Sequence, residues 1–264
     1  MPTFTDQLNQ KIKLDVTPQR IISLVPSQTE LIADLGLQSK LAGITKYCIY
    51  PPDVYLTVPH IGGTKNFNVE KIKSLNPDLI IGNKEENTKK LIEELMVDFP
   101  VWMSDVTDLP SALEMIYCVG NLTETTAKAE TLINTINNDF EKLRSEFPKK
   151  KPRTLYLIWR KPYLSVGANT FIHDMMERCG FHNVLENKTR YPELTAADIQ
   201  NLAPEIILLA TEPYPYRDKH IAEFKAICPK AKTVLAEGEY FSWYGSRLVS
   251  ACGYFKKFRE KVFN

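Results

Sequence analysis

The chain has 264 residues, of which 44% are hydrophobic and 25% are charged, as in an ordinary globular protein. The formal net charge of +1 provides neither a basic surface for nucleic acid nor an acidic tail. Since no window approaches the roughly 18 apolar residues of a membrane-spanning helix, we expect neither nucleic-acid binding nor a membrane span.

The first twenty residues lack the apolar core and the small-residue cleavage site of a secretory signal, so the sequence as given predicts a cytoplasmic protein. The cysteines are odd in number, widely spaced and without a CxxC pair, which indicates reduced, buried thiols in a reducing compartment. They are Cys48, Cys118, Cys179, Cys228 and Cys252.

Alternating strand and helix patterns fill the first part of the chain. Residues 11–16 alternate polar and apolar side chains, as an edge strand or hairpin would. Arg20–Val25 predicts a buried parallel strand, and Ser27 with Glu30 predicts a capping box for a helix that ends at Gly36. Further strands are expected at 41–45, 79–82 and 100–104, and further helices at 69–75, 84–96 and 111–119, with Gly120 as a helix break.

One long helix is expected next. From Leu122 to Phe147, apolar residues spaced mostly three and four apart place one apolar stripe on a helix that no Pro or Gly interrupts. At about 1.5 Å per residue, roughly 26 residues would make a rod of roughly 39 Å. The charged stretch 148–153 is the expected hinge, and beyond it strands are expected at 154–159 and 233–237.

Two segments on either side of the long helix are related in sequence. Residues 68–85 and 195–212 each predict an amphipathic helix, a stop marked by Pro, and a buried strand. A weaker similarity joins the segments that begin at Ile21 and Thr154. The aligned pairs include Ile72 with Ile199, Leu75 with Leu202, and Asp78 with Glu205.

This internal similarity predicts an α/β fold of two similar lobes joined by one long helix. The expected domains are an N-terminal lobe at 1–108, a helical segment at 109–151 and a C-terminal lobe at 152–264.

Aromatic residues gather in the predicted loops and strand ends. With Lys65, Arg160, Lys161 and Arg217 among them, they suit a flat or bulky organic ligand, anionic in character, in a cleft between the lobes. About half of these rings are instead expected to pack as core, Phe241 most of all. The set is Tyr47, Tyr50, Trp159, Tyr163, Tyr191, Tyr214, Tyr216, Tyr240, Phe241, Trp243 and Tyr244.

Catalytic signatures are sparse. The sequence contains no GxSxG, HExxH, GxGxxG or CxxC motif, and its four histidines show no metal-ligand spacing. The run from Asp218 to His220 begins like the DxHxxG motif of cobalamin-dependent mutases, but Glu223 stands where the glycine must be. His220 is therefore expected to be an exposed residue at a helix start. Ser27 could cap its helix or contact a ligand.

Taken in order along the chain, several segments resemble the substrate-binding proteins of cobalamin and ferric-siderophore ABC importers. The resemblance covers nearly the whole chain from Arg20. It implies two Rossmann-like lobes with parallel-rich sheets, a rigid backbone helix, and a ligand held in the cleft. The segments are RIISLVPSQTELIADLG, KYCIYPP, NVEKIKSLNPDLIIG, the long helix, EPYPYRDKH and FSWYGSRL.

Carried over residue by residue, the resemblance places Tyr47 at a cleft tyrosine of cobalamin binders and Glu239 near a cleft aspartate. Tyr191 and Lys65 stand at or beside positions of cleft tryptophans. Glu70 matches a surface glutamate that docks onto the permease. The corresponding position of the second lobe is Ala197, with Asp198 adjacent.

The leading hypothesis is a monomeric, non-catalytic binding protein of an ABC-type importer, with Glu70 and Asp198 facing a permease. It needs no intrinsic cofactor, and its ligand is a metal chelate, either a corrinoid or a ferric siderophore. An exported location follows from the family. The predicted ligand-binding residues are Tyr47, Tyr50, Lys65, Trp159, Arg160, Tyr191, Glu239, Trp243 and Tyr244.

Two alternatives remain open at this point. One is a cytosolic enzyme or sensor on the same scaffold, acting on a corrinoid or metal chelate with Glu239 or Glu212 as acid or base. The other is an interaction protein with an empty cleft.

Overall fold

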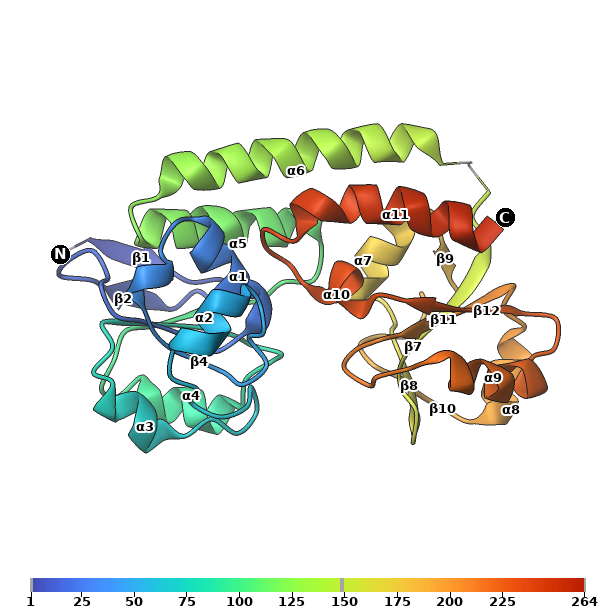
Figure 1. The fold of residues 1–264 in the computed structure, drawn as a ribbon, viewed down its shortest axis with the longest axis horizontal. Coiled ribbons are helices and arrows are strands. Elements are labelled where there is room, and N and C mark those ends of the chain that lie inside the picture. The colour runs from blue at the N-terminus through green and yellow to red at the C-terminus, as the bar shows by residue number, and fades with distance from the viewer. Residues whose placement is uncertain (1, 148–149, 264) are drawn as a thin grey trace. The chain divides into compact units, whose positions relative to one another are not determined.

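The computed structural model describes residues 2–147 and 150–263, with the helices and strands labelled in Figure 1. The chain forms two compact units. Unit 1 comprises the residues up to Val106, Pro110–Thr135 and Tyr244–Arg247, and unit 2 comprises Thr107–Leu109, Ile136–Trp243 and the residues from Leu248 onward. The boundaries expected from the sequence stay predictions, and residues 148–149 of the expected hinge lie outside the described residues.

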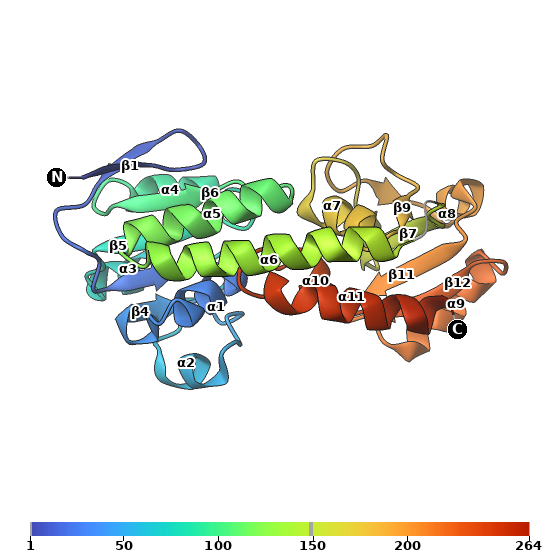
Figure 2. The ribbon, with the colours of Figure 1, turned by 90° about the horizontal axis from the view of Figure 1, so that it is seen from above.

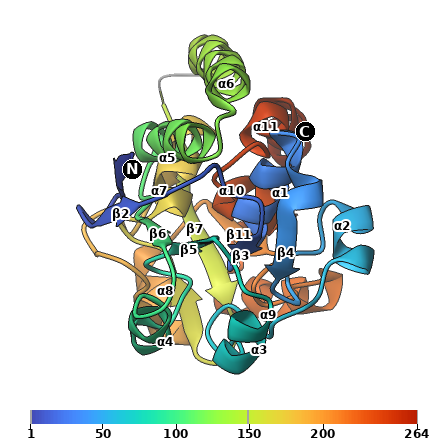
Figure 3. The ribbon, with the colours of Figure 1, turned by 90° about the vertical axis from the view of Figure 1, so that its left-hand side faces the viewer.

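Unit 1 is built on a parallel sheet with strand order β4-β3-β5-β6, covered on one face by α1 and α5 and on the other by α3 and α4 (Figure 3). A separate antiparallel hairpin, β1 with β2, confirms the hairpin expected near the N-terminus. The elements are β1 (Thr3–Thr5), β2 (Lys11–Lys13), β3 (Ile21–Ser23), α1 (Pro26–Asp34), η1 (Gln38–Lys40), β4 (Leu41–Ile44), α2 (Pro52–Thr57), α3 (Val69–Ser74), β5 (Leu79–Asn83), α4 (Lys89–Leu95), β6 (Val101–Ser104) and α5 (Leu109–Leu122).

Unit 2 is built on a mixed sheet with strand order β10-β8-β7-β11-β12, and β9 also pairs with β7. Strands β7, β11 and β12 are parallel. In Figure 1, α7, α10 and α11 lie on one side of this sheet and α8 and α9 on the other. The elements are β7 (Arg153–Trp159), β8 (Tyr163–Ser165), α7 (Phe171–Arg178), β9 (His182–Asn183), β10 (Glu193–Leu194), α8 (Ala196–Leu202), β11 (Ile206–Ala210), η2 (Asp218–His220), α9 (Ile221–Ile227), β12 (Lys232–Ala236), α10 (Gly238–Ser242) and α11 (Leu248–Phe263).

The central strands of both sheets are mostly apolar and buried because helices cover both of their faces. In unit 1, Ile21, Ile80 and Ile81 have no exposed surface, and in unit 2 the same holds for Leu155 and Leu209. The α/β class and the parallel-rich sheets expected from the sequence are therefore confirmed.

A carboxylate joins the starts of the two central strands in unit 1. The Asp78 carboxylate, just before β5, accepts the backbone N–H groups of Gln19 and Arg20 at 2.7 and 2.9 Å, just before β3. The Arg20 guanidinium in turn donates to the carbonyl of Leu75 at the end of α3. We call this arrangement the strand latch.

Unit 2 repeats the strand latch, and two of its residues, Leu202 and Glu205, are those aligned in sequence with Leu75 and Asp78. The Glu205 carboxylate, just before β11, accepts the N–H of Arg153 at the start of β7 at 2.7 Å. The Arg153 guanidinium donates to the carbonyl of Leu202 at 2.7 Å, as its counterpart in unit 1 does to Leu75. The internal similarity read from the sequence is thus confirmed at the level of single hydrogen bonds.

The long helix α6 (Thr126–Glu146) has 21 residues, so its length is about 31 Å. It is shorter than expected because α5 continues to Leu122 and a turn with Glu124 at φ +58° separates the two helices. The residues of α6 up to Thr135 belong to unit 1 and those from Ile136 onward to unit 2. Within unit 1, α5 lies beside the first part of α6 (Figure 2).

Gly120 does not break α5, contrary to the sequence-based expectation. A Cβ atom at this position would lie 2.5 Å from the Cβ of Ala129 on α6. Glycine is required here because the two helix backbones approach too closely for any side chain.

Two other expectations about helix starts were wrong. Helix α1 begins at Pro26 with Val25 as N-cap and no side-chain cap, because proline is well suited to the first helical position. The helix expected at 84–96 is only α4, because the Asn83 side-chain oxygen accepts the N–H groups of Glu85 and Glu86 and holds them in a turn. Within residues 2–147 and 150–263, no helix has the length and hydropathy required to cross a membrane.

The contact at Gly120 leads to a stability prediction. Gly120→Ala is expected to lower the free energy of unfolding by about 1–3 kcal/mol in urea denaturation, because the added methyl group clashes with Ala129. Gly253→Ala is the matched control, since nothing lies within 4 Å of a Cβ at that position of α11. This control should instead stabilise the protein by about 0.5–1 kcal/mol through helix propensity. Equal effects of the two variants would contradict the packing argument.

Candidate functional site

Three segments of unit 2 follow the carboxyl ends of β7, β11 and β12. Because these strands are parallel, the loops at 160–162 and 211–217 and the short helix α10 with its caps at 237–243 lie at one edge of the sheet, where open α/β sheets bind ligands. Two hydrogen bonds join the second loop to α10: the N–H of Gly238 donates to Thr211 Oγ1 at 3.0 Å, and the Ser242 hydroxyl donates to Glu212 at 2.6 Å.

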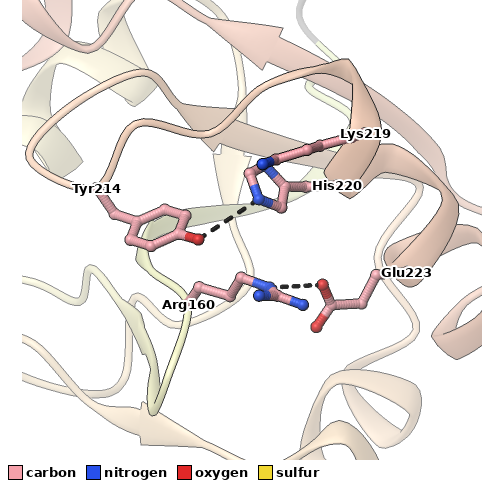
Figure 4. A pocket seen from close by; sticks show the side chains of 5 residues that line it. All are labelled: Arg160, Tyr214, Lys219, His220 and Glu223. Carbon is pink, nitrogen blue, oxygen red and sulfur yellow. Dashed lines mark hydrogen bonds and ion pairs between the residues drawn. The ribbon is translucent and has the colours of Figure 1, made fainter.

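An open pocket of about 420 Å³ lies at this edge. The lining side chains come from the loop after β7, the loop after β11, η2 and α9 (Figure 4). We call it the edge pocket. Its lining residues are Arg160, Tyr214, Lys219, His220 and Glu223.

Glu223 holds Arg160 in place. One carboxylate oxygen accepts from the Arg160 Nε–H at 2.8 Å, and the other accepts from the Tyr163 hydroxyl at 2.5 Å. Burial opposes ionisation of Glu223, but the hydrogen bonds from Tyr163 and Arg160 outweigh it, so the pKa of Glu223 lies below its ordinary value. Burial and the bond to Glu223 raise the pKa of Tyr163 to about 12. The pair is therefore ionised, and the phenol stays protonated.

His220 is buried rather than exposed, which corrects the sequence-based expectation; 6% of its surface is accessible. Its Nδ1 accepts the backbone N–H of Arg217 at 2.9 Å, so the neutral ring carries its proton on Nε2, which lies 3.4 Å from the Tyr214 hydroxyl. Burial, together with the charges of Arg160 and Lys219, lowers the pKa of His220. The ring is therefore neutral at pH 7 and donates toward Tyr214.

Aromatic rings adjoin the edge pocket. Trp159, at the end of β7, is 39% exposed and packs edge-to-face on Tyr214 with ring centroids 5.7 Å apart. Tyr214 in turn packs against the buried Tyr216, whose hydroxyl donates to the Trp159 carbonyl at 2.9 Å. In unit 2, the predicted site thus presents an aromatic surface of Trp159 and Tyr214 beside the cation of Arg160.

In unit 1, two predicted ligand residues lie in loops: Tyr47 follows β4, and Lys65 lies between α2 and α3. Tyr47, after β4, is 51% exposed, and the Lys46 ammonium lies 5.1 Å from its ring centre. The Lys65 ammonium donates to the carbonyl of Glu85, after β5, while the Thr88 hydroxyl donates to the Lys65 carbonyl at 2.6 Å. Lys65 therefore holds its own loop to the neighbouring one.

Tyr50 takes part in a cluster that the sequence did not suggest. The Arg247 guanidinium lies 4.6 Å from the Tyr50 ring centre and pairs with the Glu30 carboxylate: its Nε–H donates to one oxygen at 3.0 Å, and its Nη2 lies 2.8 Å from the other. The side chains of this ion pair are only 13% and 17% exposed. Tyr244, three residues before Arg247, is buried.

The other predicted residues are dispersed. In unit 2, Tyr191 lies before β10 with the Arg190 guanidinium 5.8 Å from its ring centre, Glu239 lies in the first turn of α10, and Trp243 is buried at the end of α10. Phe241 is fully buried, as expected.

The two expected docking residues are both exposed, and each lies in the first turn of its helix, although Asp198 is one position further along than Glu70. Glu70 is in α3, and Asp198 is in α8, where its carboxylate accepts both the N–H and the hydroxyl of Thr195 in a capping box. These hydrogen bonds lower the pKa of Asp198.

The structure brings Trp159 and Arg160 together with Tyr214, but the sequence missed Glu223 and the pair of Glu30 with Arg247. Arg160 and Glu223 are 63 residues apart in the sequence, and Glu30 and Arg247 are 217 residues apart. No local spacing therefore indicates either pair.

The model of the periplasmic binding protein family matches residues 21–226. The chain belongs to this family. It is 27% identical over 216 residues to the uncharacterized ABC transporter substrate-binding lipoprotein YvrC of Bacillus subtilis, covering 78% of this chain and 68% of that protein. Among solved structures, the periplasmic vitamin B12 binding protein BtuF of Vibrio cholerae has a TM-score of 0.80 at 20% identity, covering 93% of this chain and 98% of that one.

The periplasmic heme binding protein HutB of Vibrio cholerae has a TM-score of 0.79 at 18% identity, covering 93% of this chain and 99% of that one. These similarities confirm the two-lobed α/β fold with one long helix. The periplasmic binding protein family is one of substrate-binding proteins, which agrees with the expected non-enzymatic class.

The lowered pKa of His220 leads to a pH prediction for this family member. Protonation would place a charge on a buried ring beside Arg160 and Lys219, with Glu223 and Tyr214 also facing it. As the pH decreases, His220 is therefore protonated at a higher pH in the unfolded chain than in the folded protein. The free energy of unfolding should therefore fall as pH decreases from about 6.5, the ordinary histidine value, toward the lower folded pKa. Denaturation curves of the wild type and His220→Gln across this range test it. A slope unchanged in the variant would contradict the assignment.

The ion pair of Glu30 and Arg247 leads to a second prediction. Arg247→Ala should lower the free energy of unfolding by about 3–5 kcal/mol, because it leaves a largely buried carboxylate without its cation. Lys89→Ala is the control: Lys89 pairs with Glu93 on the surface of α4 and is 88% exposed, so its loss should cost less than about 0.5 kcal/mol. Similar decreases in the free energy of unfolding of both variants would show that the buried ion pair stabilises the protein no more than an exposed one.

Proposed function

We propose that this chain is the substrate-binding protein of an ABC-type importer and that its ligand is a metal chelate of the corrinoid or ferric-siderophore kind. The observation that carries the proposal is the surface formed by Trp159 and Tyr214 beside Arg160, at the ligand-binding edge of the unit 2 sheet. An exposed indole in contact with a second ring suits a flat or bulky organic group, and a guanidinium beside it suits an acidic or polar substituent.

The similar proteins support the same class of ligand. The names of the two structural neighbours refer to vitamin B12 and to heme, both of which are large metal macrocycles. Tyr47 of unit 1, half exposed in its loop, offers a further ring for such a ligand.

The family supports a partner and a location for the protein. YvrC is named as an ABC transporter lipoprotein, and we infer that this chain likewise acts outside the cytoplasmic membrane and delivers its ligand to a permease. Glu70 is the proposed permease contact of unit 1. Asp198 is the corresponding candidate in unit 2, although its carboxylate also caps α8.

Tryptophan fluorescence tests the proposal directly. Cobalamin, cobinamide, heme or a ferric siderophore is expected to quench the protein saturably, and Trp159 should dominate because Trp102 and Trp243 are buried. Tyr47→Ala should weaken binding by about tenfold, equivalent to about 1.4 kcal/mol for a lost ring contact.

Tyr117→Ala is the matched control for that variant. Tyr117 lies in unit 1 on α5 and is 43% exposed, but it has no proposed role, so its loss should leave affinity unchanged. Absence of saturable quenching by every chelate on the panel would refute the proposed ligand class.

A further inference from the structure

The edge pocket is built so that Arg160 keeps donors available for a ligand. Glu223 bonds the Nε–H of Arg160, and its second oxygen is occupied by the Tyr163 hydroxyl. The carboxylate therefore uses only the Nε–H of Arg160. Tyr214 also forms a hydrogen bond with the guanidinium, but the five N–H groups of an arginine still leave donors for a ligand. In Figure 4 the Arg160 guanidinium lies between Tyr214 and Glu223, on the wall of the pocket.

A chain of hydrogen bonds directs the Tyr214 hydroxyl as a donor. The N–H of Arg217 donates to His220 Nδ1, which leaves the proton of the neutral ring on Nε2. That N–H points at the Tyr214 oxygen 3.4 Å away, so the phenol accepts there and retains its own O–H for another acceptor. Since His220 is buried, solvent does not compete for the ring.

The charges of the pocket favour an anion. Arg160 and Lys219 are positive, Glu223 is negative and His220 is neutral, so the lining carries one excess positive charge. A guanidinium, an ammonium and a phenolic O–H are all donors, and a guanidinium edge matches the two oxygens of a carboxylate.

We propose that the edge pocket binds a pendant carboxylate of the chelate, held by Arg160, Tyr214 and Lys219. This inference rests on the proposed function and narrows its ligand class. Chelates with free acid side chains bind better than those whose side chains are amides or esters, because a neutral side chain leaves the excess charge uncompensated.

A pair of corrinoids that differ in this respect tests the inference. Dicyano-cobyrinic acid carries carboxylic acids where dicyano-cobinamide carries amides. We expect the wild type to bind the acid about tenfold more tightly, a difference of about 1.4 kcal/mol. Arg160→Ala should remove this preference by lowering the affinity for the acid about tenfold more than the affinity for the amide, and Arg160→Lys should retain part of it because the charge remains without the planar edge.

Lys225→Ala is the control for net charge, because Lys225 is exposed on α9 and does not line the pocket. It should leave the preference intact. If the acid and the amide bind equally well, and Arg160→Ala changes neither affinity, the carboxylate inference is overturned while the proposed function stands.

If neither corrinoid binds, and heme, its dimethyl ester and a ferric siderophore do not bind either, the proposed function fails, and a direct measurement decides the pocket. Acetate at millimolar concentrations should shift the His220 ring resonances in NMR spectra saturably in the wild type and not in Arg160→Ala. No saturable shift would overturn the carboxylate pocket as well.

Discussion

The strand latch joins the starts of two central strands and the preceding helix in each unit. Asp78 in unit 1 and Glu205 in unit 2 hold the starts of two adjacent parallel strands level with each other, and Arg20 and Arg153 tie the preceding helix to the same point. Parallel strands are joined by long crossover connections, so no tight turn can set their register. A carboxylate that accepts backbone N–H groups at the start of the neighbouring strand can set it instead. With the starts aligned, the carboxyl ends and their loops are aligned too.

The edge pocket depends on that alignment. Arg160 follows β7 directly, whereas Glu223 lies in α9, beyond β11 and η2, and the two meet only because β7 and β11 are neighbours. The same adjacency places Trp159 on Tyr214. The proposed ligand contacts of unit 2 thus lie beyond the carboxyl ends of strands whose starts are aligned at the opposite end of the sheet.

Close backbone approach is a second constraint, and it works against local propensity. Glycine is a poor helix former, yet Gly120 lies inside α5 because contact with Ala129 leaves no room for a side chain. Local rules predicted a break at this position, and packing overrode them. Helix α4 begins later than local rules predicted for a different reason. The Asn83 side chain accepts the N–H groups of Glu85 and Glu86, which would otherwise have belonged to the first turn of the helix.

The sequence by itself determined the alternation of strands and helices, the internal repeat down to Asp78 and Glu205, the long amphipathic helix and the family resemblance. These inferences depend on hydrophobic periodicity and on residues that recur at the same spacing in two segments, and both can be read from a single sequence. It also picked out Trp159 and Arg160 as candidate ligand residues. Only the tertiary structure decided that His220 is buried, that Glu223 orients Arg160, and that Glu30 pairs with Arg247. Those facts depend on contacts between distant segments and on exclusion of water, neither of which leaves a local signal in the order of the residues.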